Sequence, residues 1–243
     1  EVQQRLLPAA APAFTGLDVA GASRYCDETG GDYFDYLTMP SEAGGGLGVV
    51  GGDVAGHGLS AALLMVSARG FFRQRAALGG APESVLSDVN AQLCRDVGDS
   101  GQFMTAFLLL ANGETGDIAW VRAGHDPALL YDPEADRFTP LEGPGIPLGV
   151  EPGAAFEVRE RGGLIEGSII LLGTDGIWET ADPDGAMFGK ERLLPLVRTG
   201  RGESAQALRD RILGALETFR GPAVAADDVT LVVVKFDRSP VAL

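Results

Sequence analysis

Four aspartates stand where a run of apolar residues meets a turn, and aspartate is a residue type that can hold a metal ion. Asp53 lies in the segment 51–58, which contains four glycines, and Asp32 directly follows two glycines. Asp175 follows an apolar run and precedes a glycine, while Asp227 opens a run rich in valine. Glycine adopts backbone conformations in turns that residues with a Cβ rarely adopt, and its lack of a side chain leaves space around the neighbouring carboxylate. Carboxylate oxygens of this kind suit hard divalent cations such as Mg²⁺ and Mn²⁺.

An isolated aspartate beside a glycine has a simpler interpretation, because such a pair commonly caps a turn. These four aspartates share one setting, however, each at the end of a strand that the apolar pattern predicts. If the fold brings them together, their negative charges repel one another unless cations lie between them. The pattern therefore predicts a site for two divalent cations.

No competing nucleophile stands out in the sequence. It contains neither the Gly-x-Ser-x-Gly elbow of serine hydrolases nor the Gly-x-x-x-x-Gly-Lys-Ser/Thr loop of P-loop enzymes. Its two cysteines, Cys26 and Cys94, are too few for a disulfide framework or a zinc cluster. We interpret both as ordinary packing residues, which leaves the chemistry to the aspartates.

Five sequence motifs around these residues follow one another in a characteristic order. They begin with Gly-Gly-Asp-Tyr-Phe-Asp, end with Asp-Asp-Val-Thr-Leu-Val-Val-Val, and occupy residues 30–35, 52–65, 123–130, 174–179 and 227–234. In this order they resemble the motifs of the SpoIIE/RsbU-type branch of the metal-dependent (PPM) serine/threonine phosphatases. One such motif would be weak, whereas five in order cover nearly the whole chain.

The resemblance assigns a role to each candidate residue of the metal site. It implies that Asp53 bridges two divalent cations, Mn²⁺ or Mg²⁺, and that the backbone carbonyl of Val54 helps to hold one of them. Asp32 is implied to serve one cation, and Asp175 and Asp227 the other. Two cations about 3.5–4 Å apart would lower the pKa of a water between them and supply hydroxide for in-line attack on phosphorus. Little further chemistry would then be required of the protein.

Two histidines lie within the motifs and have different expected roles. His57 could protonate the leaving serine or threonine alkoxide, because histidine titrates near neutrality. The alternative is that His57 supports the glycine turn through a hydrogen bond, and the sequence does not decide between the two. His125 is expected to be structural, and Asp126 beside it stands where the family commonly has proline.

Two further aspartates lie next to the predicted ligands. Asp228 could bind the metal instead of Asp227, or it could hold the loop by hydrogen bonding, and we favour Asp227 as the ligand. Asp35 is expected to lie behind the ligands or on the surface.

The early strand has no obvious counterpart of the arginine with which the wider phosphatase family often grips phosphate, which is similar to the SpoIIE-type branch. This resemblance implies that the metals hold the phosphate. It also implies weak activity unless a partner or a movement completes the site.

Composition limits the class of partner and the compartment. The 243 residues carry 34 acidic and 19 basic side chains, a formal charge of −15, without a block of lysines or arginines. Nucleic acid and anionic membranes are therefore poor partners. The longest apolar run, near residues 59–66, is too short to cross a bilayer, and we recognise no signal peptide. These features predict a soluble, cytoplasmic protein.

Apolar periodicity predicts the elements that must position the site. Helices are expected near residues 61–72, 82–93, 189–197 and 203–219. Strands are expected at residues 17–25, 47–50, 103–110, 118–123, 127–131, 168–172 and 229–236. Pro195 should shorten or break the third helix. The mixture indicates an α+β fold with two mainly antiparallel central β-sheets packed as a sandwich and flanked by α-helices, which the resemblance also implies.

The chain is predicted to be one large domain with a short segment before it. Residues 1–7 end before a proline and show helical spacing, which predicts the tail of a longer linker helix that could pair two copies of the chain. Residues 9–13 are a connector, and residues 14–243 form the phosphatase-type domain. A loop of small and acidic residues is expected at 41–46.

The favoured hypothesis is a bacterial protein phosphatase that removes phosphate from a phosphoserine or phosphothreonine of a regulatory protein. The resemblance implies a STAS-type anti-sigma-factor antagonist as substrate and a sensor or receiver domain upstream. The alternative is a catalytically weak or inactive regulatory module of the same fold that binds a phosphorylated partner, although the intact set of four aspartates argues against it. A third hypothesis is a hydrolase of small phosphate esters, which a substrate panel would distinguish.

Overall fold

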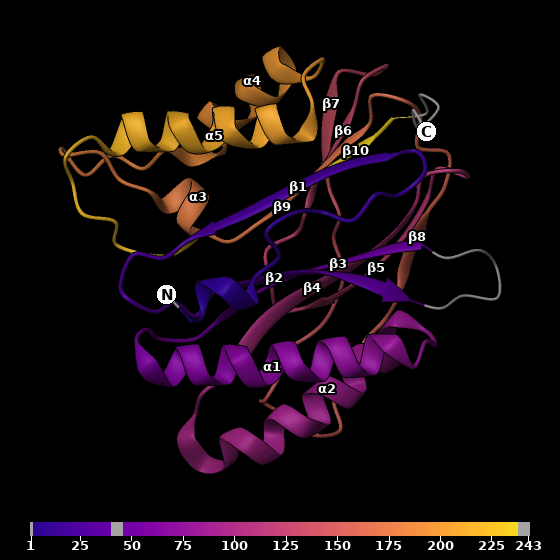
Figure 1. Cartoon of the computed structure of the whole chain (residues 1–243), viewed down its shortest axis with the longest axis vertical. Coiled ribbons are helices and arrows are strands. Elements are labelled where there is room, and N and C mark those ends of the chain that lie inside the picture. The colour runs from indigo at the N-terminus through magenta and orange to yellow at the C-terminus, as the bar shows by residue number, and fades with distance from the viewer. Residues whose placement is uncertain (1, 40–45, 238–243) are drawn as a thin grey trace.

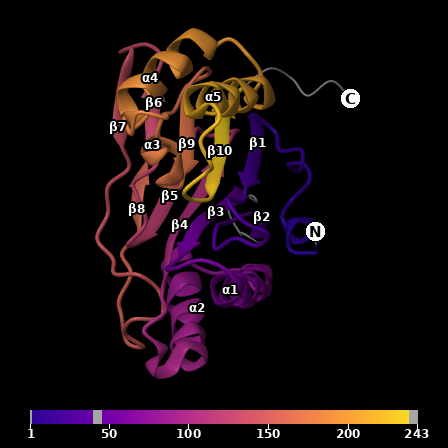
Figure 2. The same ribbon diagram turned by 90° about the vertical axis from the view of Figure 1, so that its left-hand side faces the viewer.

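Two five-stranded antiparallel sheets pack face to face, and helices cover both outer faces (Figure 1). The computed structural model describes residues 2–39 and 46–237. The layers follow one another as helices, sheet, sheet, helices, which is clearest when the sheets are seen edge on (Figure 2). This arrangement confirms the predicted α+β sandwich.

The strands of each sheet come from both halves of the chain. The first sheet has the order β1 (Leu17–Arg24), β10 (Val229–Phe236), β9 (Ile169–Gly173), β6 (Leu129–Asp132) and β7 (Arg137–Pro140). The second sheet has the order β2 (Tyr33–Met39), β3 (Gly46–Val54), β4 (Met104–Asn112), β5 (Asp117–Ala123) and β8 (Arg159–Arg161). Residues far apart in sequence therefore meet at the strand ends.

Each sheet has its own pair of covering helices. The helices α1 (Leu59–Ala77) and α2 (Pro82–Val97) pack on the second sheet, and α4 (Gly189–Gly200) and α5 (Ala205–Arg220) pack on the first. Three shorter elements are α3 (Gly176–Glu179) and the 3-10 turns η1 (Gln4–Leu6) and η2 (Gly98–Ser100). No helix in the described ranges is long and apolar enough to cross a membrane.

The central strands are apolar on both faces because both faces are covered. Val49 packs between the two sheets, whereas its neighbour Val50 packs toward α1 and α2. Val232 and Val233 in β10 divide in the same way, between the inter-sheet core and the helices α4 and α5. Alternate residues of a strand point to opposite faces, so a strand buried on both sides has a continuous apolar run.

Two expectations about helices need correction. Residues 2–7 do not form an α-helix but contain the single turn η1, while Glu1 lies outside the described residues. Pro195 does not break α4, which continues for 12 residues with the proline inside it. Pro195 is exposed, so the carbonyl that loses its backbone hydrogen bond can bond to water instead.

Two other expectations are left without a test. The loop predicted at 41–46 lies outside the described residues apart from its last residue. The division into a linker at 1–13 and a domain at 14–243 stays a prediction.

Candidate metal centre

Asp53 lies at the end of β3, between its neighbours β2 and β4 in the sheet. The strand runs without interruption to Val54, so Gly51 and Gly52 are strand residues and not part of a turn as expected. Their small size serves packing, since a Cβ on Gly51 would lie 3.0 Å from the Leu172 side chain of the opposite sheet. The turn itself follows the strand and contains Gly56 and Gly58 with φ of 90° and 76°.

A gap beside Gly31 faces the two oxygen atoms that the resemblance assigns to the metals. A Cβ on Gly31 would lie 2.9 Å from the Val54 carbonyl oxygen and 3.4 Å from Asp53 Oδ1. The Val54 amide donates a hydrogen bond to the Gly31 carbonyl at 3.3 Å, which holds the two segments together. Val54 is buried, with 0% of its surface exposed, so glycine at position 31 lets the segment before Asp32 pack closely against the carbonyl of Val54 and the carboxylate of Asp53.

Asp32 immediately precedes β2 and is buried, with 1% of its surface exposed. Thr174 Oγ1 donates to Asp32 Oδ2 at 2.8 Å and accepts from the Thr230 amide at 3.0 Å. Burial and the charge of Asp53 raise the pKa of Asp32 well above its usual value, while the hydroxyl donors oppose that shift. The carboxylate is thus fixed in position in an environment that disfavours its charge.

Asp227 and Asp228 are adjacent in sequence but have opposite environments. Asp228 is 5% exposed, and its two oxygens accept hydrogen bonds from the Cys26 amide at 2.8 Å and the Asp32 amide at 3.3 Å. Asp227 is exposed, and one of its oxygens accepts from the Asp228 amide at 2.8 Å. Asp228 therefore holds the loop that carries Asp32, whereas Asp227 presents its carboxylate outward.

Negative charge accumulates around Asp53. Burial, followed by the charges of Asp175, Asp227 and Asp228, raises the pKa of Asp53 to about 7. Burial and the charge of Asp175 also raise the pKa of Asp227. Asp53 and Asp175 line one cavity of about 90 Å³. The structure thus brings the four aspartates to one edge of the sandwich, where their mutual repulsion favours a bound cation.

The donor set of this centre fits hard divalent cations. Among the described residues, no three His, Cys, Asp or Glu side chains are arranged to hold a metal ion by themselves. Mg²⁺ usually keeps several waters and takes only one or two carboxylates, so it does not need such a cluster. The carboxylate of Asp53, whose own negative charge is disfavoured, matches that requirement, and the carbonyl of Val54 lies beside it next to Gly31.

The two histidines lie in different surroundings. His125 is 3% exposed, its Nδ1 lies 2.8 Å from Thr105 Oγ1, and burial lowers its pKa to about 4. Thr105 Oγ1 in turn donates to the Asp53 carbonyl at 3.4 Å, so His125 supports the end of β3 from behind. His57 is exposed, and its imidazole forms no hydrogen bond with any residue in the described ranges. His57 lies close enough to Asp227 to oppose slightly the net rise in the pKa of that carboxyl, which places His57 on the outer side of the centre.

Asp35 and Asp126 lie behind and beside the centre. Asp35 is buried, not on the surface, and Arg73 Nη1 contacts its two oxygens at 2.9 and 2.8 Å. This ion pair ties β2 to α1, away from the predicted ligands. Asp126 lines the cavity with Asp53 and forms an ion pair at 3.4 Å with Lys190, whose ammonium lies 4.4 Å from the centroid of the Trp178 ring.

The sequence analysis did not single out Thr174 or Gln3. Gln3 is 8% exposed, its Nε2 donates to the Gly30 carbonyl at 2.7 Å, and its Oε1 accepts from the Gly30 amide at 3.1 Å. It therefore holds the turn before Asp32. Thr174 stands next to Asp175 inside a motif, which was a usable signal, whereas Gln3 lies in a segment without a motif.

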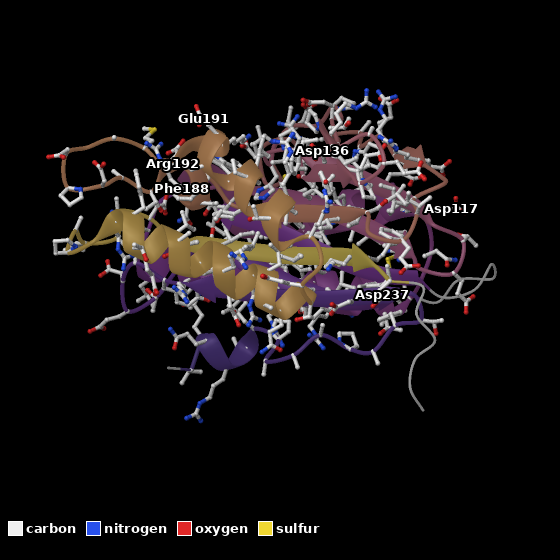
Figure 3. The ribbon with its side chains drawn as sticks, turned by 90° about the horizontal axis from the view of Figure 1, so that it is seen from above. Asp117, Asp136, Phe188, Glu191, Arg192 and Asp237 are labelled. Atoms are coloured by element: carbon white, nitrogen blue, oxygen red, sulfur yellow. The ribbon has the colours of Figure 1, made fainter. Side chains whose placement is uncertain are left out.

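Not all of the acidic side chains belong to this centre. Asp117 and Asp237 lie toward one end of the molecule, and Phe188 and Glu191 toward the other (Figure 3). The formal charge of −15 is therefore spread over the surface as well as gathered at the four aspartates.

Comparison with known proteins gives several related matches. The family model described as Stage II sporulation protein E (SpoIIE) matches residues 43–237. Phosphoserine phosphatase RsbU of Bacillus subtilis (strain 168) is 26% identical over 234 residues, which cover 96% of this chain and 68% of RsbU. A crystal structure of the RsbU and RsbW domains of a Mycobacterium tuberculosis protein is 26% identical with a TM-score of 0.78, and the match covers 97% of this chain and 64% of that one.

A third match supports the fold alone. The PP2C phosphatase domain of SpoIIE from Bacillus subtilis, solved with a fragment of its regulatory domain, is 17% identical with a TM-score of 0.74 over 90% of this chain and 63% of that one. This chain thus spans about two thirds of the length of each of these three proteins. The family model covers most of the chain, and the predicted resemblance is confirmed: the chain belongs to the SpoIIE family, in the RsbU-containing branch of the PP2C-type (PPM) phosphatases.

Proposed function

We propose that this domain, a phosphatase of the SpoIIE family, hydrolyses phosphoserine or phosphothreonine on a regulatory protein with the help of two divalent cations. The observation that carries the proposal is the meeting of Asp32, Asp53, Asp175 and Asp227 at one edge of the sandwich. The Val54 carbonyl beside Gly31 would add a neutral oxygen to this set. A phosphate monoester is negatively charged and needs a positively charged group beside it. The described side chains around the aspartates are mainly acidic, so the cations would supply that positive charge.

Each ligand has a place in this proposal. Asp53 would bridge the cations, the Val54 carbonyl and Asp32 would face the inner one, and Asp175 and Asp227 would hold the outer one. When bound, the cations would lower the pKa of a water and neutralise charge on the phosphoryl oxygens. Mn²⁺ and Mg²⁺ both suit the oxygen donors. The hydrogen bonds of Asp228 to the Cys26 and Asp32 amides leave Asp227 as the aspartate of that pair with a free side.

His57 is the candidate proton donor to the leaving alkoxide. It is exposed, near Asp227, and without a hydrogen bond to the described residues that would fix it as a support for the turn. His125 is a poor candidate, because its burial keeps the imidazole neutral at pH 7. We therefore assign His57 to proton transfer and His125 to positioning β3.

The substrate and setting proposed for this chain follow from its relatives. RsbU is a phosphoserine phosphatase, and we extend that specificity to this chain. A STAS-type anti-sigma-factor antagonist is the proposed substrate, with a sensor or receiver domain upstream and a cytoplasmic location. Pairing of two copies through the segment before residue 14 is part of the same proposal.

The test is phosphate release from a phosphoserine substrate by purified protein with Mn²⁺. Asp53→Asn should reduce release by about 1000-fold or more, since the bridging carboxylate is lost. Asp96→Asn, an exposed aspartate on α2, is the matched control and should leave the rate unchanged. Turnover retained by Asp53→Asn would rule out the metal mechanism. Tight binding of the phosphorylated partner without release by the unmodified protein would instead support a binding module.

A further inference from the structure

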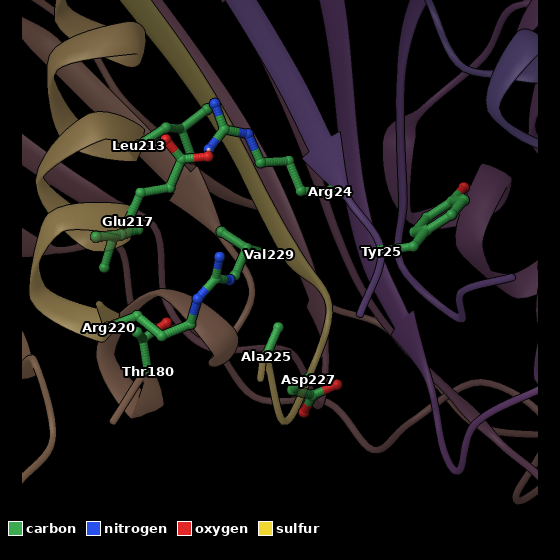
Figure 4. A pocket seen from close by; sticks show the side chains of 10 residues that line it. Arg24, Tyr25, Thr180, Leu213, Glu217, Arg220, Ala225, Asp227 and Val229 are labelled. Carbon is green, nitrogen blue, oxygen red and sulfur yellow. The ribbon is translucent and has the colours of Figure 1, made fainter. Parts of the chain in front are cut away.

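A small pocket lies beside Asp227 on the side of α5 (Figure 4). The end of β1, the C-terminal part of α5 and the start of β10 form its walls around a cavity of about 40 Å³. Asp227 lines the pocket, so the pocket and the proposed metal centre share a wall. A substrate side chain that enters this pocket would therefore come from a residue close to the phosphorylated residue at the proposed metal centre.

Arg220 is a cationic group of this pocket that has no ion-pair partner among the described residues. Arg24 forms an ion pair with Glu217, and both side chains are about half exposed. Arg220 forms no ion pair with any residue that the structure describes, and its Nε atom is buried without a hydrogen-bond acceptor among them. Figure 4 shows the guanidinium of Arg220 below the Arg24 and Glu217 pair, while the carboxylate of Asp227 points away from it.

The unpaired guanidinium of Arg220 indicates which chemical group the pocket would bind. Buried donors in folded proteins almost always have an acceptor, so the Nε–H of Arg220 requires a water or a ligand oxygen. The planar guanidinium matches the geometry of a carboxylate or phosphate. The cavity admits a carboxylate-sized group, and Leu213 and Val229 in its wall offer apolar contact to the methylene groups behind such a carboxylate.

An acidic occupant would be admitted by the local charge of Arg220, and not by the charge of the chain as a whole. The chain carries a formal charge of −15, so it repels acidic partners over most of its surface. Glu217 is already paired with Arg24, which leaves the charge of Arg220 available. Arg24, the last residue of β1, is itself paired with Glu217 and is therefore not free to grip the phosphate.

We propose that this pocket receives the carboxylate of an acidic side chain that flanks the phosphorylated residue of the substrate, and that Arg220 binds it. The inference rests on the proposed phosphatase function and adds a substrate class to it. The carboxylate takes no part in the chemical step, so Arg220 determines specificity and is not catalytic.

The test uses phosphoserine peptides with glutamine at every flanking position and variants with a single glutamate at each of those positions in turn. One glutamate position should raise kcat/KM by about 3- to 10-fold, mainly through a lower KM, as expected for a partly exposed ion pair. Arg220→Gln should abolish that preference and leave hydrolysis of para-nitrophenyl phosphate unchanged. Arg24→Gln, which frees Glu217 to repel the glutamate, should also abolish it.

Arg95→Gln, an exposed arginine on α2, is the matched control and should retain the preference. Melting temperatures of all variants establish that each is folded. Equal kcat/KM for all peptides with the unmodified protein, or a preference that survives Arg220→Gln, would overturn the inference while the phosphatase function stands. Absence of hydrolysis of both peptides and para-nitrophenyl phosphate would instead overturn the proposed function.

Discussion

The inner and outer halves of the candidate centre differ in how firmly the protein holds them. On the inner side, Asp32 is buried, accepts a hydrogen bond from Thr174, and sits on a loop fixed by Asp228. On the outer side, Asp175 is partly exposed and Asp227 exposed. The inner half is therefore preorganised by the fold, whereas in the proposed centre a cation would draw the outer carboxylates together. Under this proposal, the difference separates residues needed for folding from residues needed for chemistry.

Removal of an outer ligand should have the largest effect and tests the difference between the two halves most strongly. Asp227→Asn should lower phosphate release by about 1000-fold, because the outer cation loses a carboxylate. Its free energy of unfolding without metal should change by less than about 0.5 kcal/mol, because the side chain is exposed. Activity assays and urea denaturation of the same preparation give both values. A variant that is strongly destabilised would place Asp227 in the structural half.

The histidines extend the comparison to proton transfer. His57→Gln should lower the rate with a phosphoserine peptide by about 100-fold, because its alkoxide leaving group needs a proton. Hydrolysis of para-nitrophenyl phosphate should change little, because nitrophenolate leaves without one. His125→Gln should slow both substrates equally or destabilise the fold. Equal losses on both substrates for His57→Gln would contradict a role in proton donation.

Substitution of a residue in the inner half should mainly lower the free energy of unfolding. Asp228→Ala leaves the Cys26 and Asp32 amides without their acceptor, which should cost about 2 kcal/mol in the free energy of unfolding. Asp228→Asn keeps one acceptor oxygen and should lose less. Mn²⁺ affinity should fall in both variants, because the loop that carries Asp32 is released. Unchanged stability of Asp228→Ala would show that the loop is held by other contacts, such as those of Gln3.

The free energy of unfolding without metal is also expected to depend on pH. Asp53 has a pKa of about 7 in the folded protein and about 3.8 when unfolded. Between these values the folded state keeps a proton that the unfolded state has lost, so the free energy of unfolding should fall as pH rises from about 4 to about 7. Asp53→Asn should flatten this slope in thermal melts with EDTA. An unchanged slope in the variant would show that groups other than Asp53 cause the pH dependence.

Mn²⁺ should stabilise the folded protein more as pH rises, whereas the proton on Asp53 stabilises it less. Because cation binding requires the carboxylates to lose their protons, added Mn²⁺ should raise the melting temperature more at pH 8 than at pH 5. An equal rise at both pH values would show that Asp53 is not among the groups that bind it.

The sequence was informative where a motif joins a strand to a turn. Asp53 and Asp175 could be located because apolar runs and glycines mark the strand ends, and the order of the motifs identified the family. The sandwich was predictable from the periodicity of long, apolar elements. The short polar strands β7 and β8 were missed because four and three residues, most of them charged or exposed, carry no clear alternation.

Contacts between distant segments were beyond the sequence analysis. Thr174 bonds to Asp32 across 142 residues, and Asp228 bonds to the Asp32 amide across 196. Spacing along the chain carries no signal for such pairs. The burial of Asp35 was missed for the same reason, since its arginine partner lies on a helix 38 residues away.

Anomalous diffraction from crystals soaked in Mn²⁺ would test the central claim most directly. The account predicts two manganese peaks bridged by Asp53, the inner one near Asp32 and the Val54 carbonyl, and the outer one held by Asp175 and Asp227. Manganese peaks that avoid Asp53, in a protein that still releases phosphate, would contradict it.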